Sequence, residues 1–113
     1  MGKPEGIVED YLIAQCKKHK FWCKKFVSPG ETGVPDRIVI ANGCTMFIEL
    51  KSKNGRLSEK QKIIIDEIKN AGGKVYVAYT KEQIDTILNK YTAKDINSLI
   101  PTGKPVEVSY NPE

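Results

Sequence analysis

The stretch GVPDRIVIANGCTMFIELKSKNG, residues 33–55, decides the fold. It contains two runs rich in apolar and β-branched residues, 37–41 and 45–51, which predict two strands. Asn42-Gly43 separates them, and this dipeptide is the strongest short-range signal for a hairpin with a two-residue turn. Asp36 stands at the start of the first run, and Glu49 and Lys51 stand in the second. These charges need an explanation, because an unpaired charge that faces a protein core is energetically expensive.

A two-residue turn determines which residues of the hairpin face each other. Residue 41 then faces residue 44, and the same register places Asp36 opposite Glu49. Lys51 points to the same face, because side chains alternate along a strand. Carboxylates in opposed positions have Cβ atoms about 4.5–5.5 Å apart, and like charges at that spacing are destabilising. A three-residue loop would instead pair position 36 with position 50 and send the two acids to opposite faces.

Two explanations of the acid pair remain open from these residues. A divalent cation such as Mg²⁺ accepts two carboxylates, a backbone carbonyl and water molecules, and it can activate a water molecule for attack on a phosphate. A nearby ammonium such as that of Lys51 could hold the water or the charge of the leaving group. The alternative is an exposed salt bridge among Asp36, Glu49 and Lys51 with no catalytic role.

The remaining segments predict an α/β layer protein, in which helices cover a mixed sheet. A helix is expected over 5–19, and its apolar stripe consists of Ile7, Val8, Tyr11, Leu12 and Cys16. Further strands are expected over 21–27 and 74–80, with a Gly- and Pro-rich loop over 28–35 and a second loop over 52–57.

Two capping boxes predict where the later helices begin. Ser58 with Gln61 starts a helix that ends at Gly72-Gly73, and Thr80 with Gln83 starts another that runs to about residue 90. The buried face of the first of these helices is expected to consist of Ile64, Ile65, Ile68 and Ala71. A short helix after Thr92 is expected to stop by Pro101.

Length and composition indicate one domain, 1–113, with a core over about 5–91 and a tail over 101–113. The net charge of +4 permits a nucleic-acid partner without requiring one. Three cysteines without a C-x-x-C motif suggest free thiols in a reducing compartment, and their spacing around His19 matches no common zinc finger. No apolar stretch reaches the length of a membrane helix and no signal peptide is evident, so we expect no membrane partner and a cytoplasmic location, that of the host bacterium if the protein is viral.

The segments SPGETGVPDRIVI and FIELKSKNGRLSEKQ resemble the VRR-NUC family of the PD-(D/E)XK nuclease superfamily, in the small stand-alone form carried by bacteriophages. The resemblance lies in the G-V-P-D strand start, the E-x-K of Glu49-Leu50-Lys51, and the glutamine twelve residues after Glu49; it extends from about Ile7 to Val77. It implies a restriction-endonuclease-like fold, with a mixed β-sheet flanked by helices. It also implies Mg²⁺- or Mn²⁺-dependent hydrolysis of phosphodiester bonds in DNA.

The resemblance assigns roles to particular residues. Metal ligands would be Asp36, Glu49, the Leu50 backbone carbonyl and Glu9 of the first helix, while Lys51 would assist the attacking water and Gln61 would join the site. A solvated helix acid is the alternative for Glu9, and the capping box alone is the alternative for Gln61. Contacts to DNA are expected from Lys24, Lys25, Arg37, Lys53 and Arg56, in and around the basic runs 17–25 and 51–62.

Stand-alone members of the family are similar to Holliday-junction resolvases and tend to be homodimers. The resemblance therefore implies a homodimeric, structure-selective endonuclease that acts on branched or junction DNA. The alternatives are a nicking, flap or linear-DNA nuclease without junction preference, an inactive DNA-binding module on the same fold, and a small domain whose acids make only surface salt bridges.

Overall fold

The computed structural model describes residues 4–92, so the expected helix after Thr92 and the tail 101–113 lie outside the described residues. The elements in chain order are α1 (Pro4–His19), β1 (Trp22–Lys25), β2 (Arg37–Ala41), β3 (Cys44–Leu50), α2 (Glu59–Asn70), β4 (Val75–Ala78) and α3 (Lys81–Asn89). In this part of the chain no helix is both long enough and apolar enough to cross a membrane.

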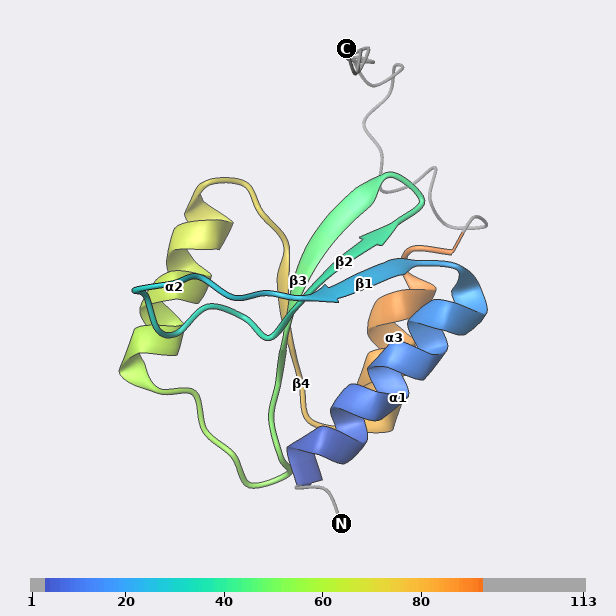
Figure 1. Cartoon of the computed structure of the whole chain (residues 1–113), viewed down its shortest axis with the longest axis horizontal. Helices are drawn as coiled ribbons and strands as arrows, with labels where there is room; N and C mark the ends of the chain where they lie inside the picture. Colours follow the sequence, from blue (N-terminus) through green and yellow to red (C-terminus); the bar gives the residue numbers. More distant parts are fainter. Residues whose placement is uncertain (1–3, 93–113) are drawn as a thin grey trace.

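The strands form one mixed sheet in the order β1-β2-β3-β4. The pairs β1–β2 and β2–β3 are antiparallel, whereas β3 and β4 are parallel and are connected through α2. Helices α1 and α3 lie side by side on one face of the sheet, and α2 covers part of the other face (Figure 1). The predicted α/β layer architecture is confirmed.

The hairpin has the predicted register. Ala41 faces Cys44 and Ile38 faces Phe47. Asn42 and Gly43 both have positive φ angles, 49° and 86°, as a type I′ turn requires. This turn follows the natural twist of the two strands, so the local sequence determined the pairing.

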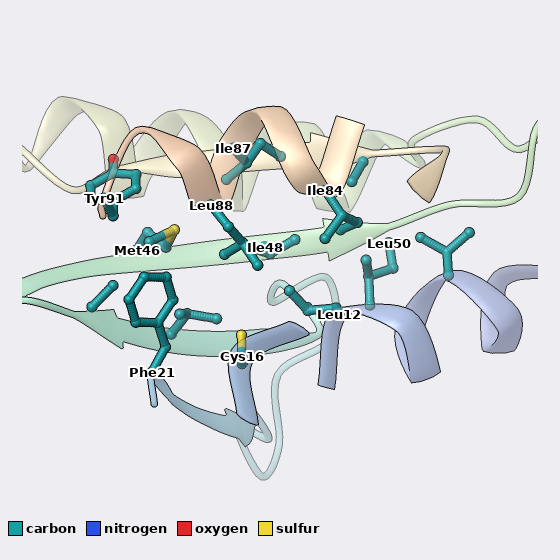
Figure 2. Packing of buried hydrophobic residues seen from close by; sticks show 14 residues of the cluster. Leu12, Cys16, Phe21, Met46, Ile48, Leu50, Ile84, Ile87, Leu88 and Tyr91 are labelled. Atoms are coloured by element: carbon teal, nitrogen blue, oxygen red, sulfur yellow. The ribbon is translucent and has the colours of Figure 1, made fainter. Parts of the chain in front are cut away.

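The core lies between the sheet and the α1–α3 layer (Figure 2). As predicted, Met46, Ile48 and Leu50 point into it from β3, where they meet side chains of α1 and α3 such as Leu12 and Ile84. Buried residues of α1 recur every four positions, at Val8, Leu12 and Cys16.

Two expected core residues are exposed. The prediction that Ile7 belongs to the apolar stripe that packs on the core is wrong. Its side chain is 53% exposed, and it lies one position before Val8, where the buried row of α1 begins. The prediction that Ala71 lies on the buried face of α2 is also wrong. Ala71 is the exposed C-cap residue, and the buried residues of α2 are Ile64 and Ile65.

The helix starts are close to the expectation. The Ser58 hydroxyl accepts the Gln61 N–H and the Gln61 side chain accepts the Ser58 N–H, which completes the predicted capping box. Thr80 likewise accepts the Gln83 N–H at 3.1 Å. The second hydrogen bond of the predicted capping box differs from the prediction. The Gln83 side chain accepts the N–H of Tyr79, one residue before the N-cap Thr80, in place of the Thr80 N–H.

Candidate active site

Asp36 and Glu49 lie beside each other at one end of the sheet. The register of β2 and β3 continues to these two positions, so both side chains belong to the face that α2 partly covers. Glu49 is only 2% exposed, whereas Asp36 is half-buried. The salt bridge expected under the non-catalytic explanation would be exposed, and the burial of Glu49 disfavours that explanation.

Asp36 is held in place by a backbone amide of the neighbouring strand. Its Oδ2 accepts the Leu50 N–H at 2.8 Å. If the register that pairs Arg37 with Ile48 is continued by two residues, Leu50 lies opposite Pro35, and a proline has no N–H to donate to the Leu50 carbonyl. Pro35 therefore cannot donate a ladder hydrogen bond to that carbonyl. The sequence contained this signal, because the register that pairs Asp36 with Glu49 also pairs Pro35 with Leu50.

Two side chains converge on the Glu49 carboxylate. Gln61 Nε2 donates to Oε2 at 3.1 Å, and Lys51 Nζ lies 3.4 Å from the same oxygen. Burial is the main cause that raises the pKa of Glu49, to about 7, and the negative charge of Asp36 raises it further. The charge of Lys51 opposes this rise in the pKa. Near neutral pH the Glu49 carboxyl is therefore partly protonated, and a bound cation would shift it toward the ionised form.

Gln61 makes the predicted capping contact and also contacts the acid pair. Its Oε1 accepts the Ser58 N–H at 2.9 Å as part of the capping box, while its Nε2 donates to Glu49. One side chain thus joins the first turn of α2 to the buried acid of β3.

Gly33 explains part of the G-V-P-D motif. Its φ angle is +91°, and a Cβ atom there would lie 2.7 Å from Lys60 Cγ and 3.0 Å from the Lys60 backbone. The 28–35 loop therefore passes directly against the first turn of α2, and only glycine fits at that contact. This contact sets the approach of the chain to Pro35 and Asp36.

Glu9 is not brought to the acid pair. Its Oε2 lies 2.8 Å from Arg37 Nε, and Arg37 faces Ile48 on the opposite face of the sheet from Asp36 and Glu49. Among residues 4–92 no three histidine, cysteine or acidic side chains lie together closely enough to hold a metal ion. The structure brings together the carboxylates of Asp36 and Glu49, which are hard oxygens of the kind that Mg²⁺ and Mn²⁺ bind.

The expected DNA-contacting residues fall on different parts of the surface. Lys24 faces Ile38 and shares the face of the acid pair, whereas Lys25 faces Arg37 and belongs to the other face. Lys53 and Arg56 are exposed in the loop after β3. Arg56 lines a hollow of about 340 Å³ together with Lys62 and Tyr79, a residue that the sequence did not single out.

Comparisons with known proteins show which family and fold the chain resembles. The family model described as VRR-NUC domain matches residues 5–82. A protein of Acyrthosiphon pisum secondary endosymbiont phage 1, named "Putative nuclease p44", is 43% identical over 49 residues, which cover 42% of this chain and 53% of that protein. The matched part is thus about half the length of this curated relative.

A solved structure titled as a VRR-NUC domain superposes with a TM-score of 0.73 at 24% identity, covering 80% of this chain and 99% of that one. That domain has the restriction-endonuclease-like fold, which confirms the expected fold class. Since the family model spans most of the described residues and the hairpin of the motif has the expected register, the chain belongs to the VRR-NUC family of nuclease domains.

Proposed function

We propose that this protein is a divalent-metal-dependent DNA endonuclease that hydrolyses phosphodiester bonds at the Asp36–Glu49 pair. The observation that carries the proposal is a buried glutamate beside a second acid, with a lysine and a glutamine bound to it, in a chain of the VRR-NUC family. A domain that used these acids only for stability would have little reason to bury Glu49 next to a like charge, because that arrangement is destabilising.

The ligands we propose are the carboxylates of Asp36 and Glu49 and the backbone carbonyl of Leu50, with Mg²⁺ or Mn²⁺ as the ion. When bound, the ion would offset charge on the phosphate and lower the pKa of a water molecule. Asp36 is already oriented by the Leu50 N–H, and Gln61 fixes the orientation of Glu49. Both acids therefore need little rearrangement before they bind a cation.

Lys51 is proposed to assist the attacking water. Its Nζ is 3.4 Å from Glu49 Oε2 and its side chain is 14% exposed, so the ammonium is held at the site by the carboxylate. Once a cation shares that carboxylate, the ammonium can donate to a water molecule or to a phosphate oxygen. A lysine in this position also reduces the charge repulsion between the acids when no cation is bound.

Glu9 remains a predicted fourth ligand. To reach an ion at the acid pair it would have to exchange its bond to Arg37 for the metal. The geometry thus supports Glu9 as the partner of Arg37 more directly than as a ligand.

The proposed substrate is branched or junction DNA, and the proposed assembly is a homodimer that presents two active sites to two strands. Two-fold symmetry suits a four-way junction, and the lysine-rich run 17–25 supplies sequence-independent contacts to phosphates. The alternatives are a nicking, flap or linear-DNA nuclease and an inactive DNA-binding module on the same fold. The retained Asp36, Glu49 and Lys51 favour an active enzyme over the inactive module.

The test combines metal binding with cleavage. Thermal unfolding is measured with EDTA, Mg²⁺ or Mn²⁺, because an ion at 100 times its Kd stabilises the fold by roughly 2.7 kcal/mol. Four-way-junction, flap and linear duplex DNA are then incubated under the same conditions. We expect metal-dependent stabilisation and cleavage, both lost in Glu49→Gln and both retained in Asp66→Asn, which changes an exposed acid of α2.

Each other outcome has a distinct meaning. Equal cleavage of all three DNAs would reject junction selectivity and leave a nuclease. Binding of DNA without cleavage under any condition would favour the inactive module. Absence of any response to either metal would reject the proposed metal site. Sedimentation of the protein at micromolar concentration tests the homodimer.

A further inference from the structure

Trp22 is the single tryptophan of the chain, and it lies on the surface. Its side chain is 49% exposed, and Ile40, its partner across the β1–β2 pair, is 40% exposed. Large apolar side chains that lie together on a surface commonly mark an interaction site. Neither residue contributes to the core or to the acid pair.

The strand register relates Trp22 to the candidate active site. Trp22 pairs with Ile40, which pairs with Thr45, and Ile40 lies four residues beyond Asp36. An even separation puts Trp22 on the same face of the sheet as Asp36 and Glu49. Four residues of strand span about 13 Å, and β1 is one strand away from Asp36 and two from Glu49, so the tryptophan lies roughly 15 Å from the acid pair.

The surroundings of Trp22 are basic. Together with Lys17, Lys24 and the exposed Ile13, it lines a hollow of about 310 Å³ at the edge strand β1, where α1 approaches from the opposite face of the sheet (Figure 1). The run 17–25 contains five lysines and no acidic residue. An aromatic face among lysines is complementary to nucleotides, which combine an apolar base with an anionic phosphate.

We propose that Trp22 stacks on an unpaired base of the DNA substrate, with Lys17 and Lys24 binding the adjacent phosphates. The inference deepens the proposed function and depends on it for the identity of the substrate strand: the DNA would carry a single-stranded segment roughly 15 Å from the cleaved bond. Intact duplex offers no free base face within the stack, so this contact selects flaps, overhangs and opened branch points. A second copy of the chain is a poorer occupant, because two lysine runs would face each other across a two-fold axis.

The first experiment uses Trp22 itself as the probe. Fluorescence of the whole chain is recorded in EDTA, to prevent metal-dependent cleavage, during titration with an oligothymidine single strand, a blunt duplex and a duplex with a single-stranded flap. We expect strong quenching by the single strand and by the flap DNA, and weak quenching by the blunt duplex. Equal response to all three DNAs, or no response to any, would overturn the proposal.

The second experiment measures binding of a labelled flap DNA to variants by anisotropy. Loss of one stacked base predicts about 5- to 150-fold weaker binding for Trp22→Ala, with most of the affinity recovered in Trp22→Tyr. Ile63→Ala is the matched control, because Ile63 is a 52% exposed apolar residue of α2. If Ile63→Ala weakened binding as much as Trp22→Ala, the effect would be nonspecific and the proposal wrong.

The outcomes also separate this inference from the proposed function. Flap-selective quenching without cleavage in any metal would support stacking and reject the nuclease. Cleavage that is indifferent to Trp22→Ala, with no quenching, would keep the nuclease and reject stacking. If Trp22→Ala converted a dimer into monomers in sedimentation and left flap binding unchanged, a second copy of the chain would cover this face instead.

Discussion

Gln61 Nε2 donates to Glu49 Oε2 at 3.1 Å while Gln61 Oε1 accepts the Ser58 N–H at 2.9 Å. A residue at the third position of a helix therefore fixes a buried acid of the neighbouring sheet. The helix start and the candidate active site are coupled through this one side chain, and the two contributions can be separated by substitution.

Gln61→Glu preserves the capping box, because glutamate also accepts the N-cap amide, but it places a second carboxylate against Glu49. We expect its metal-free thermal stability to fall more at pH 8 than at pH 5, since repulsion requires both acids to be ionised. Ser58→Ala is the control: it removes the cap and costs about 1 kcal/mol at both pH values. A loss in Gln61→Glu that does not depend on pH would show that the bond to Glu49 is unimportant.

The raised pKa of Glu49 predicts an unusual pH dependence of stability. The folded-state pKa is about 7, against an ordinary value of 4.5, so between these values the folded protein binds more protons than the unfolded chain. The contribution of Glu49 is therefore largest below pH 4.5 and is lost as the pH rises through 7. At ~1.4 kcal/mol per pKa unit the whole change is on the order of 3 kcal/mol.

Urea unfolding in EDTA at pH 5 and pH 8 measures this dependence. We expect the difference in free energy of unfolding between the wild type and Glu49→Gln to favour the variant more at pH 8 than at pH 5, because glutamine does not ionise. Saturating Mn²⁺ should reduce the difference at pH 8 by neutralising the acid. A pH-independent difference would contradict the raised pKa.

Substitutions of Asp36 separate its charge from its hydrogen bond. Asp36→Asn keeps an acceptor for the Leu50 N–H and relieves the repulsion with Glu49, so metal-free stability should be unchanged or higher at pH 8. Asp36→Ala leaves that amide without its acceptor and should cost about 1–3 kcal/mol. Both variants should lose cleavage. Wild-type cleavage by Asp36→Asn would show that the site has been misassigned.

Glu9→Gln tests whether this residue serves Arg37 or a metal ion. The ion pair is partly exposed, so its loss should cost no more than about 1 kcal/mol of stability. If Glu9 serves Arg37 alone, Mn²⁺ should stabilise this variant as much as the wild type, and as much as Asp10→Asn, which changes the neighbouring exposed acid. Loss of Mn²⁺ stabilisation in Glu9→Gln alone would instead establish Glu9 as a ligand.

Much of the site could be predicted because it depends on local rules. The Asn42-Gly43 turn determines the pairing of its two strands, and strand alternation then places Asp36, Glu49 and Lys51 on one face. The Ser58 capping box is likewise a matter of residues three positions apart.

The parts that sequence alone did not provide depend on contacts between distant segments. Glu9 and Arg37 are far apart in the chain, and periodicity could not show which element the acid would face. The contact of Gly33 with Lys60 and the two bonds of Gln61 arise only when α2 packs beside the loop. Ile7 followed the helical pattern and was still exposed, because α1 packs through the adjacent row of residues.

The strand order has a consequence for handling the protein in solution. Within the described residues β1 pairs only with β2, so its outer backbone groups are open to strands of other molecules. Two of its four residues are Lys24 and Lys25, and charged residues on such an edge oppose sheet-to-sheet aggregation. Replacing both lysines by neutral residues would therefore promote precipitation, whether or not either lysine binds DNA.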